Sequence, residues 1–328
     1  MGMGMSALHH TDLLVVGAGP AGYTAAIYAA RANMKPLLVT GMQPGGQLTI
    51  TTDVENYPGF AEPIQGPWLM EQMRAQAEHV GTNITYDLIT EASLKNGRDT
   101  DGYFHLKGDS GDTYLARTVV IATGAQAKWL GLEAETRLRT GGVSACATCD
   151  GFFYRGKTVA VIGGGNTAVE EALYLTHHAE TVHLIHRRDT LRAERILQDR
   201  LLAHPKIKTH WNVAVNDIIG GGMPEVVHGI ELKSTTTGEL SRLDVDGVFV
   251  AIGHHPNTGP FRDQVACDAE GYIITEAGGT QTNIPGVFAA GDVQDRIFRQ
   301  AVTAAGTGCM AALEAERFLA NIPAMTKT

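Results

Sequence analysis

A short apolar strand followed by a glycine-rich turn and a helix occurs twice in this sequence, and no other feature limits the fold as strongly. The first copy spans residues 13–32 and the second spans residues 158–175, and their first glycines, Gly17 and Gly163, are 146 positions apart. Such turns bind the pyrophosphate of a dinucleotide at the N-terminus of the helix. The sequence therefore predicts an α/β fold with two Rossmann-like nucleotide-binding domains.

The first turn has the small residues that a pyrophosphate site needs. Gly17 allows a tight turn after the strand, Gly19 lets a phosphate approach the backbone, and Gly22 lets the helix pack on the strand. A glycine-rich turn without a ligand is the alternative. The candidate contacts in this turn are Gly17, Gly19, Pro20, Ala21 and Gly22.

The second turn is followed by positive charge instead of the usual acidic residue. An acidic residue would repel a 2′-phosphate, whereas guanidinium groups bind one through charge-assisted hydrogen bonds. This site is therefore predicted to prefer NADPH to NADH, although a solvated, basic start of a helix is the alternative. The candidate contacts are Gly163, Gly165, Asn166, Thr167 and Ala168 in the turn, and His186, Arg187, Arg188 and Arg192 in the basic cluster.

A flavin is indicated by an apolar strand that ends in Ala290-Gly291-Asp292. The Asp292 carboxylate can accept hydrogen bonds from a ribityl or ribose hydroxyl. A buried aspartate that caps a helix is the alternative. The acidic residue expected for the adenosine ribose is missing, because Thr40-Gly41 stands at the end of the second strand. A hydroxyl and backbone groups could replace it, so FAD remains the best interpretation for the first domain.

Two cysteines separated by two residues, Cys146 and Cys149, lie between the two glycine-rich turns. This spacing can close a small disulfide ring and often lowers the pKa of one thiol, so it favours exchange chemistry. A carboxyl beside such thiols, as in Asp150, is expected to have a raised pKa. A turn aspartate before Gly151 is the alternative for Asp150, and a zinc site is disfavoured because no second pair of Cys or His follows.

The second domain is predicted to be inserted into the first. Two strands that end in glycine, Val119 to Gly124 and Val248 to Gly253, bracket the second turn and look like two crossings between domains. The expected domains are residues 1–124, 125–253 and 254–328, where the first and last together form the FAD domain. The first 125 or so residues are predicted to have βαβ organisation. Two short crossings favour a hinge.

Composition excludes several classes of protein. The formal charge of −9 with scattered Lys and Arg argues against a nucleic-acid partner. Four cysteines in 328 residues argue against a secreted disulfide framework and favour a reducing compartment, the cytoplasm. The uncharged run from Leu13 to Ala30 is interrupted by glycines, so it is not expected to span a membrane. Residues Met1 to His10 show no secretory signal and are expected to form a loose tail.

Together these segments resemble the low-molecular-weight bacterial thioredoxin reductases over nearly the whole chain. The resemblance rests on six segments, which are the turn Gly17 to Gly22, the run Gly45-Gly46-Gln47, the run Glu55 to Gly59, the segment Cys146 to Asp150, the cluster His186-Arg187-Arg188 and Gly291-Asp292. It is specific because the thiol pair lies inside the NADPH domain. It implies a homodimer and further residues that line FAD, which are Thr40, Gly41, Gly45, Gly46, Gln47, Asn56, Asp292, Arg299, Gln300 and Ala301.

The implied reaction is the transfer of two electrons from NADPH through FAD to the Cys146–Cys149 disulfide and then to the disulfide of thioredoxin. The resemblance implies that Cys149 faces the flavin, that Cys146 is the outward nucleophile and that Asp150 is the general acid or base. It also implies that the inserted domain rotates between the half-reactions. The reduction of another small disulfide protein, an oxygen-dependent dithiol oxidase and a non-enzymatic flavin-binding regulator are the alternatives.

Three aromatic residues, Phe152, Phe153 and Tyr154, follow the thiols. They are predicted either to form a contact patch for thioredoxin or to belong to the core, and the sequence does not separate these two interpretations. Cys267 and Cys309 have no cysteine at a useful spacing and are expected to be free structural thiols.

Overall fold

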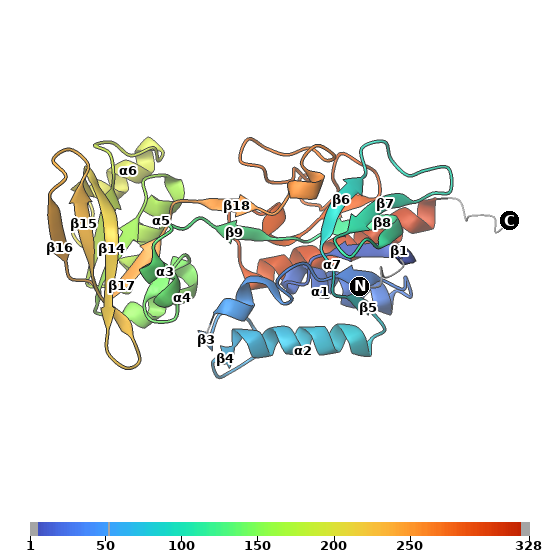
Figure 1. Ribbon diagram of the computed structural model, residues 1–328, viewed down its shortest axis with the longest axis horizontal. Helices are drawn as coiled ribbons and strands as arrows, with labels where there is room; N and C mark the ends of the chain where they lie inside the picture. Colours follow the sequence, from blue (N-terminus) through green and yellow to red (C-terminus); the bar gives the residue numbers. More distant parts are fainter. Residues whose placement is uncertain (1–5, 52, 323–328) are drawn as a thin grey trace, which may run out of the picture. The chain divides into compact units, whose positions relative to one another are not determined.

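A computed structural model describes residues 6–51 and 53–322. The chain forms two compact units, one made of the residues up to Gln126 together with those from His255 onward, and the other made of Ala127–His254. The expected boundaries were residues 124/125 and 253/254. The chain passes between the units twice, through β9 (Ala125–Ala127) and β18 (His254–Pro256), and these two short strands pair with each other (Figure 1).

The first unit is built on a seven-stranded sheet with the order β5-β2-β1-β8-β7-β6, in which β19 also pairs with β8. Strands β5, β2, β1, β8 and β19 run parallel, whereas β7 and β6 are antiparallel additions at one edge. The strands are β1 (Leu8–Val16), β2 (Leu37–Val39), β5 (Asn83–Thr85), β6 (Ile89–Ser93), β7 (Phe104–Gly108), β8 (Thr113–Ile121) and β19 (Val287–Ala289).

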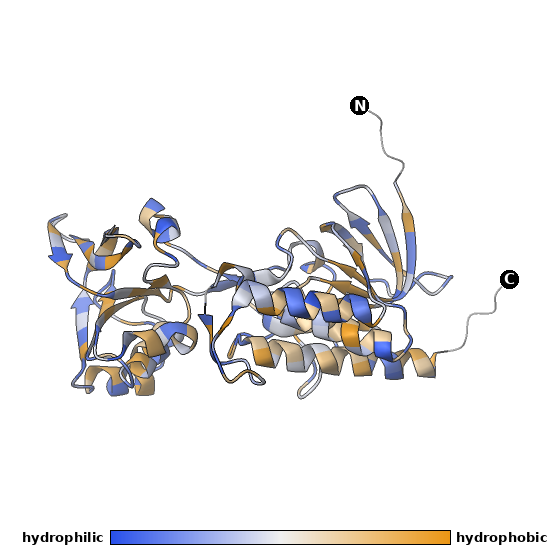
Figure 2. Cartoon of the chain, turned by 90° about the horizontal axis from the view of Figure 1, so that it is seen from below, coloured by the Kyte–Doolittle hydropathy of each residue, from blue (hydrophilic) through white to orange (hydrophobic). Residues whose placement is uncertain are grey.

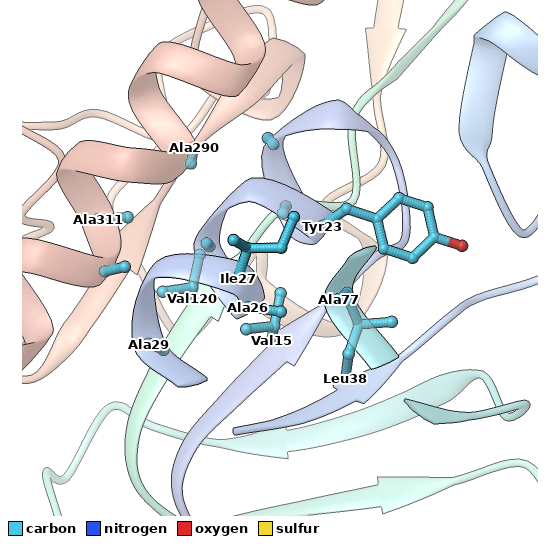
Figure 3. Close-up of a cluster of buried hydrophobic side chains, with 14 of the residues drawn as sticks. Val15, Tyr23, Ala26, Ile27, Ala29, Leu38, Ala77, Val120, Ala290 and Ala311 are labelled. Carbon is cyan, nitrogen blue, oxygen red and sulfur yellow. The ribbon is translucent and has the colours of Figure 1, made fainter. Parts of the chain in front are cut away.

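Three helices accompany this sheet, and they are α1 (Pro20–Arg31), α2 (Gly66–His79) and α7 (Ala301–Asn321). Alternate residues of β1 enter different cores, because successive side chains of a strand point to opposite faces. Leu13 and Val15 join the cluster formed with α1 and α7, while Leu14 belongs to the cluster on the other face. Figure 3 shows side chains from α1 and from the C-terminal segment meeting over Val15 and Val120.

Helices α1 and α7 pack closely because both are rich in small residues. Gly308 on α7 lies so near α1 that an added Cβ would come within 2.2 Å of the Ala21 carbonyl oxygen. Pro20 is tolerated at the start of α1, where no intrahelical partner for its missing N–H is needed. Figure 2 shows that the helices of this unit carry both hydrophilic and hydrophobic residues, as expected for helices with one buried face.

Short elements complete the first unit. The turn η1 (Gly46–Ile50) and the strands β3 (Asp53–Val54) and β4 (Ile64–Gln65) lie between β2 and α2 in the sequence, and η3 (Gly259–Phe261) and η4 (Gly291–Val293) belong to the C-terminal segment. No helix among residues 6–51 and 53–322 is long and apolar enough to cross a membrane.

The second unit has a five-stranded parallel sheet with the order β10-β17-β11-β12-β13. Residues of α5 and α6 share one buried cluster with this sheet, and residues of the antiparallel sheet β14-β15-β16 share another. The strands are β10 (Val143–Ser144), β11 (Thr158–Ile162), β12 (Thr181–His186), β13 (Ile207–Trp211), β14 (Val213–Gly221), β15 (Val226–Ser234), β16 (Leu240–Leu243) and β17 (Gly247–Val250). The helical segments are α3 (Glu133–Arg137), α4 (Ala147–Asp150), η2 (Gly151–Tyr154), α5 (Asn166–Leu175) and α6 (Arg195–Leu202).

The predicted α/β fold with two parallel sheets is confirmed, and two local expectations were wrong. The loose tail expected up to His10 ends earlier, because β1 begins at Leu8 and pairs there with Thr113; residues 1–5 of that expectation lie outside the described residues. The βαβ organisation expected for the first 125 residues stops after β5. No helix links β6, β7 and β8, so these strands form an antiparallel meander.

Candidate redox and nucleotide-binding sites

The predicted thiol pair forms a disulfide. Cys146 follows β10 in an extended conformation and Cys149 lies on α4, with their Cα atoms 5.3 Å apart. The backbone N–H groups of Cys149 and Asp150 both donate to the Cys146 carbonyl oxygen, at 3.3 and 3.1 Å. One helical turn therefore brings both sulfur atoms and the carboxyl of Asp150 into one short segment, with Cys149 exposed and Cys146 partly buried.

Asp150 is partly buried, and this burial raises the pKa of its carboxyl, as expected from the sequence. The nearby Ser144 hydroxyl acts in the opposite direction and lowers the pKa of Asp150. Ser144 also accepts a hydrogen bond from the Cys146 N–H at 3.0 Å. Asp150 thus directly follows Cys149 in the chain, and its carboxyl retains a proton at a higher pH than an exposed aspartate does.

The three aromatic residues after the thiols have different surroundings. Phe152 and Phe153 are 44% and 39% exposed, and the Arg155 guanidinium lies 4.1 Å from the centre of the Phe152 ring. Tyr154 instead packs edge-on against the buried Phe249. The first two rings therefore lie at the surface, and the third packs against the core.

The first glycine-rich turn has space for a ligand at one position. An added Cβ on Gly17 or Gly22 would lie 2.3 Å from the Ala122 oxygen or 1.8 Å from the Gly17 oxygen, whereas one on Gly19 would meet no atom within 4 Å. The turn is thus closely packed on two sides and open at its middle glycine. This is the arrangement that close approach of a phosphate to the backbone requires.

The loop after β2 lies against this turn. The Gly45 N–H donates to the Ala18 oxygen at 3.0 Å, and Gly46 is so close that an added Cβ would be 3.3 Å from the Gly19 Cα. Gln47 is exposed on η1. The predicted residues Gly45 and Gly46 therefore lie against the turn, and Gln47 follows them in the chain.

Thr40 was expected to replace the missing acidic residue as a partner of the adenosine ribose, but its hydroxyl is engaged within the chain. It is 3% exposed, and its hydroxyl donates to the Gly41 carbonyl oxygen at 3.1 Å. The Gly41 N–H donates to the Asp87 oxygen. Both groups that were expected to face a ribose thus have partners within the chain, and Thr40 supports the loop conformation.

Asp292 lies on η4, directly after β19, and is partly buried. Burial and the nearby charge of Asp295 raise the pKa of Asp292 to about 7, and Arg299 partly offsets this effect. The helix-capping alternative does not apply to α7, because Gln300 is its N-cap and forms a capping box with Thr303. A hydroxyl donor from a ligand would stabilise the Asp292 carboxylate.

Residues far apart in the sequence meet beside η4. The Asn56 side-chain amide lies 3.5 Å from the Gln300 oxygen, across 244 positions of the chain. Arg299 has a positive φ of 48°, and its N–H donates to the Asp295 carboxylate at 3.1 Å. The structure thus brings Asn56 to Gln300, which lies between Arg299 and Ala301 at the start of α7.

The second glycine-rich turn repeats the geometry of the first. An added Cβ on Gly163 would lie 2.4 Å from the Ala251 oxygen, whereas one on Gly165 would meet no atom within 4 Å. Asn166 and Thr167 begin α5, and Ala168 is buried against Gly163. The middle position is again the open one, as it is at Gly19.

The basic cluster is attached to this turn through its backbone. The Arg192 N–H donates to the Gly164 oxygen at 2.7 Å, and the Glu194 N–H donates to the Asn166 side-chain oxygen at 2.8 Å. Arg187, Arg188 and Arg192 are all exposed. They lie on the loop between β12 and α6, which begins at Arg195.

His186 does not share the surface with these arginines. It is 6% exposed, an added Cβ on Gly164 would lie 2.2 Å from its ring, and its Nε2 lies 2.9 Å from the Thr190 oxygen. The His186 ring therefore packs against the glycine-rich turn at Gly164 and contacts the following loop at Thr190. The sequence grouped it with the arginines because it is their neighbour, although it is the last residue of β12.

Both turns fit dinucleotides, since the backbone at each middle glycine is open while the glycine or alanine residues on either side of it are closely packed.

Sequence reasoning missed three supporting residues, Ser144, Gln43 and Glu194. Gln43 donates to the Gly46 oxygen at 3.0 Å and thereby holds the loop around the first turn. No sequence motif marks these three residues, because the fold determines which groups they contact.

The two remaining cysteines are free and partly buried. Burial is the main cause of the raised pKa of Cys267. The nearby Cys309 thiol raises the pKa of Tyr28 on α1. Within residues 6–51 and 53–322, no group of three or more His, Cys, Asp or Glu side chains is arranged to hold a metal ion.

Comparisons with known proteins agree with this geometry. Residues 11–308 match the family described as pyridine nucleotide-disulphide oxidoreductase. The chain is 58% identical over 309 residues to a thioredoxin reductase of Rickettsia conorii, which covers 94% of this chain and 98% of that protein.

Two solved structures are also similar along the chain. The thioredoxin reductase of Streptococcus pyogenes is 39% identical, covers 95% of this chain and 99% of its own, and has a TM-score of 0.88. The Lactococcus lactis thioredoxin reductase in an FR conformation is also 39% identical, covers 95% and 100%, and has a TM-score of 0.62.

Proposed function

Because the chain belongs to the pyridine nucleotide-disulphide oxidoreductases, and among them to the thioredoxin reductases, we propose that it reduces oxidised thioredoxin with electrons from NADPH. The observation that carries this proposal is the Cys146–Cys149 disulfide on one helical turn, in a chain with two glycine-rich turns that are open at their middle glycines. A disulfide placed this way can be reduced and formed again without unfolding of the protein.

The open turn of the first unit, with Asp292, Asn56 and the loop at Gly45, would hold FAD. The turn at Gly163 and the exposed Arg187, Arg188 and Arg192 would hold NADPH. When bound, these groups supply two electrons to the disulfide, one hydride equivalent for each disulfide reduced. The arginines favour NADPH because a 2′-phosphate accepts charge-assisted hydrogen bonds from guanidinium groups.

The cysteines then carry out thiol–disulfide exchange. In the proposed order, the Cys146 thiolate attacks one sulfur of the thioredoxin disulfide, which forms a mixed disulfide and releases one thioredoxin thiolate. The Cys149 thiolate attacks Cys146, which closes the Cys146–Cys149 bond and releases the second thioredoxin thiolate. Two electrons pass to thioredoxin, and two protons convert the released thiolates to thiols.

Asp150 is proposed to hold and deliver a proton during this exchange. Its carboxyl has a raised pKa because of burial, so it retains a proton at a higher pH than an exposed aspartate does. The exposed rings of Phe152 and Phe153 are proposed to dock thioredoxin, because exposed aromatic side chains beside a reactive disulfide suit a protein contact.

Rotation of one unit on the crossings β9 and β18 is part of the proposal. Two solved relatives with the same 39% identity to this chain superpose on it with TM-scores of 0.88 and 0.62. This difference supports the idea that such proteins occur in more than one arrangement. We further propose that the protein works as a homodimer in the cytoplasm.

The first test is anaerobic oxidation of NADPH by the FAD-loaded protein, with and without oxidised thioredoxin. Rapid oxidation that requires both thioredoxin and Cys146 is the expected result, and Cys146→Ser is the control. Reduction of the flavin without turnover of thioredoxin would retain the two nucleotide sites but replace the substrate with another disulfide protein. If the assay is repeated in air, turnover that requires oxygen and no thioredoxin would favour a dithiol oxidase.

A further inference from the structure

The Thr148 side chain contacts one of the two sulfur atoms of the redox disulfide. Its hydroxyl oxygen lies 3.4 Å from the Cys146 Sγ, and Thr148 is exposed on α4. A disulfide sulfur carries no hydrogen, so the hydroxyl is the donor in this contact and the sulfur is the acceptor. The closed disulfide therefore already has a hydroxyl proton beside the sulfur of Cys146.

The backbone around Cys146 makes this contact possible. Residues two positions apart on a helix do not face each other. Cys146 precedes α4, however, and has an extended backbone with φ −145° and ψ 99°, so its side chain does not follow the direction set by the helix. Its N–H donates to the Ser144 Oγ at 3.0 Å, and its carbonyl oxygen accepts from the N–H groups of Cys149 and Asp150. None of these hydrogen-bonding groups changes when the disulfide is reduced.

We propose that the Thr148 hydroxyl donates a hydrogen bond to the Cys146 thiolate of the reduced protein and is a catalytic residue of the thiol–disulfide exchange. This inference rests on the proposed function, because Cys146 is the proposed nucleophile. A thiolate carries a full negative charge, so it accepts a stronger hydrogen bond than the neutral disulfide sulfur does. Thr148 thereby favours the thiolate form of Cys146, which is the form that attacks a disulfide.

The same hydrogen bond also acts when the disulfide is opened. A nucleophile that attacks the Cys149 sulfur forms a bond to it, and the S–S bond breaks so that its electron pair stays on the Cys146 sulfur. The sulfur that forms the more stable thiolate is the better leaving group. Cys149 is exposed and Cys146 is partly buried, so accessibility and the hydrogen bond favour the same direction of opening.

Ionisable groups near the thiols also act on Cys146, and a change confined to the hydroxyl separates their effect from that of Thr148. Valine has nearly the shape of threonine and lacks the hydroxyl, so Thr148→Val leaves every neighbouring charge in place. Those on and beside the elements that contact α4 are Asp150 itself, Glu170, Glu171 and Tyr174 on α5, His177 and His178 after it, Tyr154 and Arg155 at the end of η2, and Asp246 before β17.

The test measures how fast iodoacetamide alkylates Cys146 at a series of pH values. The FAD-loaded protein carries Cys149→Ala, so one thiol remains in the segment, and mass spectrometry follows its peptide separately from those of Cys267 and Cys309. Thr148→Val should move the midpoint of the pH profile upward by about one unit, because a hydrogen bond to a charged group is lost. Thr148→Ser keeps a hydroxyl and should stay near the parent protein.

Thr136→Val is the matched control, because Thr136 is exposed on α3, outside the segment of the thiols, and its midpoint should not move. An unchanged or lower midpoint in Thr148→Val, or an equal rise in Thr148→Ser, overturns the proposal. If Thr148→Val does not fold, Thr148→Ala removes the same hydroxyl and should show the same rise. The measurement needs neither NADPH nor thioredoxin, so a failed reductase assay would reject the proposed function while the midpoint still decides this inference.

Discussion

The two glycine-rich turns have the same backbone geometry and different surroundings. In both, the middle glycine is open while its neighbours are closely packed, as at Gly19 and Gly165. The first turn is bordered by the glycine loop at Gly45 and has Asp292 in its unit, whereas the second is bordered by exposed arginines. If each turn binds the phosphates of a dinucleotide, as we propose, the residues around it decide which dinucleotide binds.

The largest expected effect comes from filling the closely packed side of the first turn. Gly22→Ala places a Cβ 1.8 Å from the Gly17 oxygen, so the strand and helix must separate. We expect a loss of about 3 kcal/mol or more in the free energy of unfolding, together with loss of bound flavin. Thermal unfolding and flavin absorbance measure both effects.

Gly19→Ala is the matched control, because its Cβ would meet no protein atom within 4 Å. This variant should keep its stability without ligand and lose affinity for FAD. Equal stability of Gly22→Ala and Gly19→Ala would show that the turn tolerates a side chain on its packed side. Such a result would remove the packing argument for both turns.

The second prediction concerns the surroundings of the second turn. Arg187→Ala with Arg188→Ala should raise the KM for NADPH by roughly 10- to 100-fold, because charge-assisted hydrogen bonds to the 2′-phosphate are lost. The KM for NADH should change little. Steady-state kinetics with both cofactors measure this difference.

Arg195→Ala is the control for loss of charge alone, since Arg195 is exposed on α6 and pairs with Asp199. It should leave the KM for both cofactors unchanged. An equal rise for NADPH and NADH in the double variant would place the arginines outside the 2′-phosphate site. The contrast between the two turns would then need another explanation.

The smallest expected effect is a pH dependence of the free energy of unfolding, caused by Asp292 in the first unit. The folded protein raises the pKa of Asp292 to about 7, above the usual value of about 4 in an unfolded chain. The folded state therefore holds the proton more tightly, and its stability falls as pH rises from about 4 to about 7. The loss should be about 2 kcal/mol in flavin-free protein, after allowance for partial exposure.

Urea unfolding of flavin-free protein at a series of pH values measures this slope. Asp292→Asn should remove it, and Glu276→Gln, which changes an exposed carboxyl, should retain it. A slope that persists in Asp292→Asn would assign it to another group. Bound FAD should reduce the slope if its hydroxyls donate to Asp292.

Local patterns predicted much of the fold and of the site. The strand Thr158–Ile162 and the helix that ends at Leu175 occur as expected, because their apolar spacing and glycines act within a few residues. The disulfide followed from its spacing in the same way. Contacts such as that between Asn56 and Gln300 depend on chain segments 244 positions apart, which no local pattern encodes.

The incorrect predictions for Leu8 and His186 have related physical causes. Leu8 joins a strand because Thr113 is available as a partner, and that partner is set by the fold. His186 was grouped with the arginines because it directly precedes two of them in the sequence, yet it ends β12, in which Val182 to His186 are all buried. Residue type suggested chemistry, and strand geometry decided exposure.

The first unit is assembled from two stretches of chain, and this has a consequence for synthesis on the ribosome. The strand β19 pairs with β8, and α7 packs on α1, so the unit lacks a strand and a helix until the last quarter of the chain has emerged. The second unit, Ala127–His254, is continuous. We expect it to become protease-resistant on nascent chains before the unit whose synthesis began first.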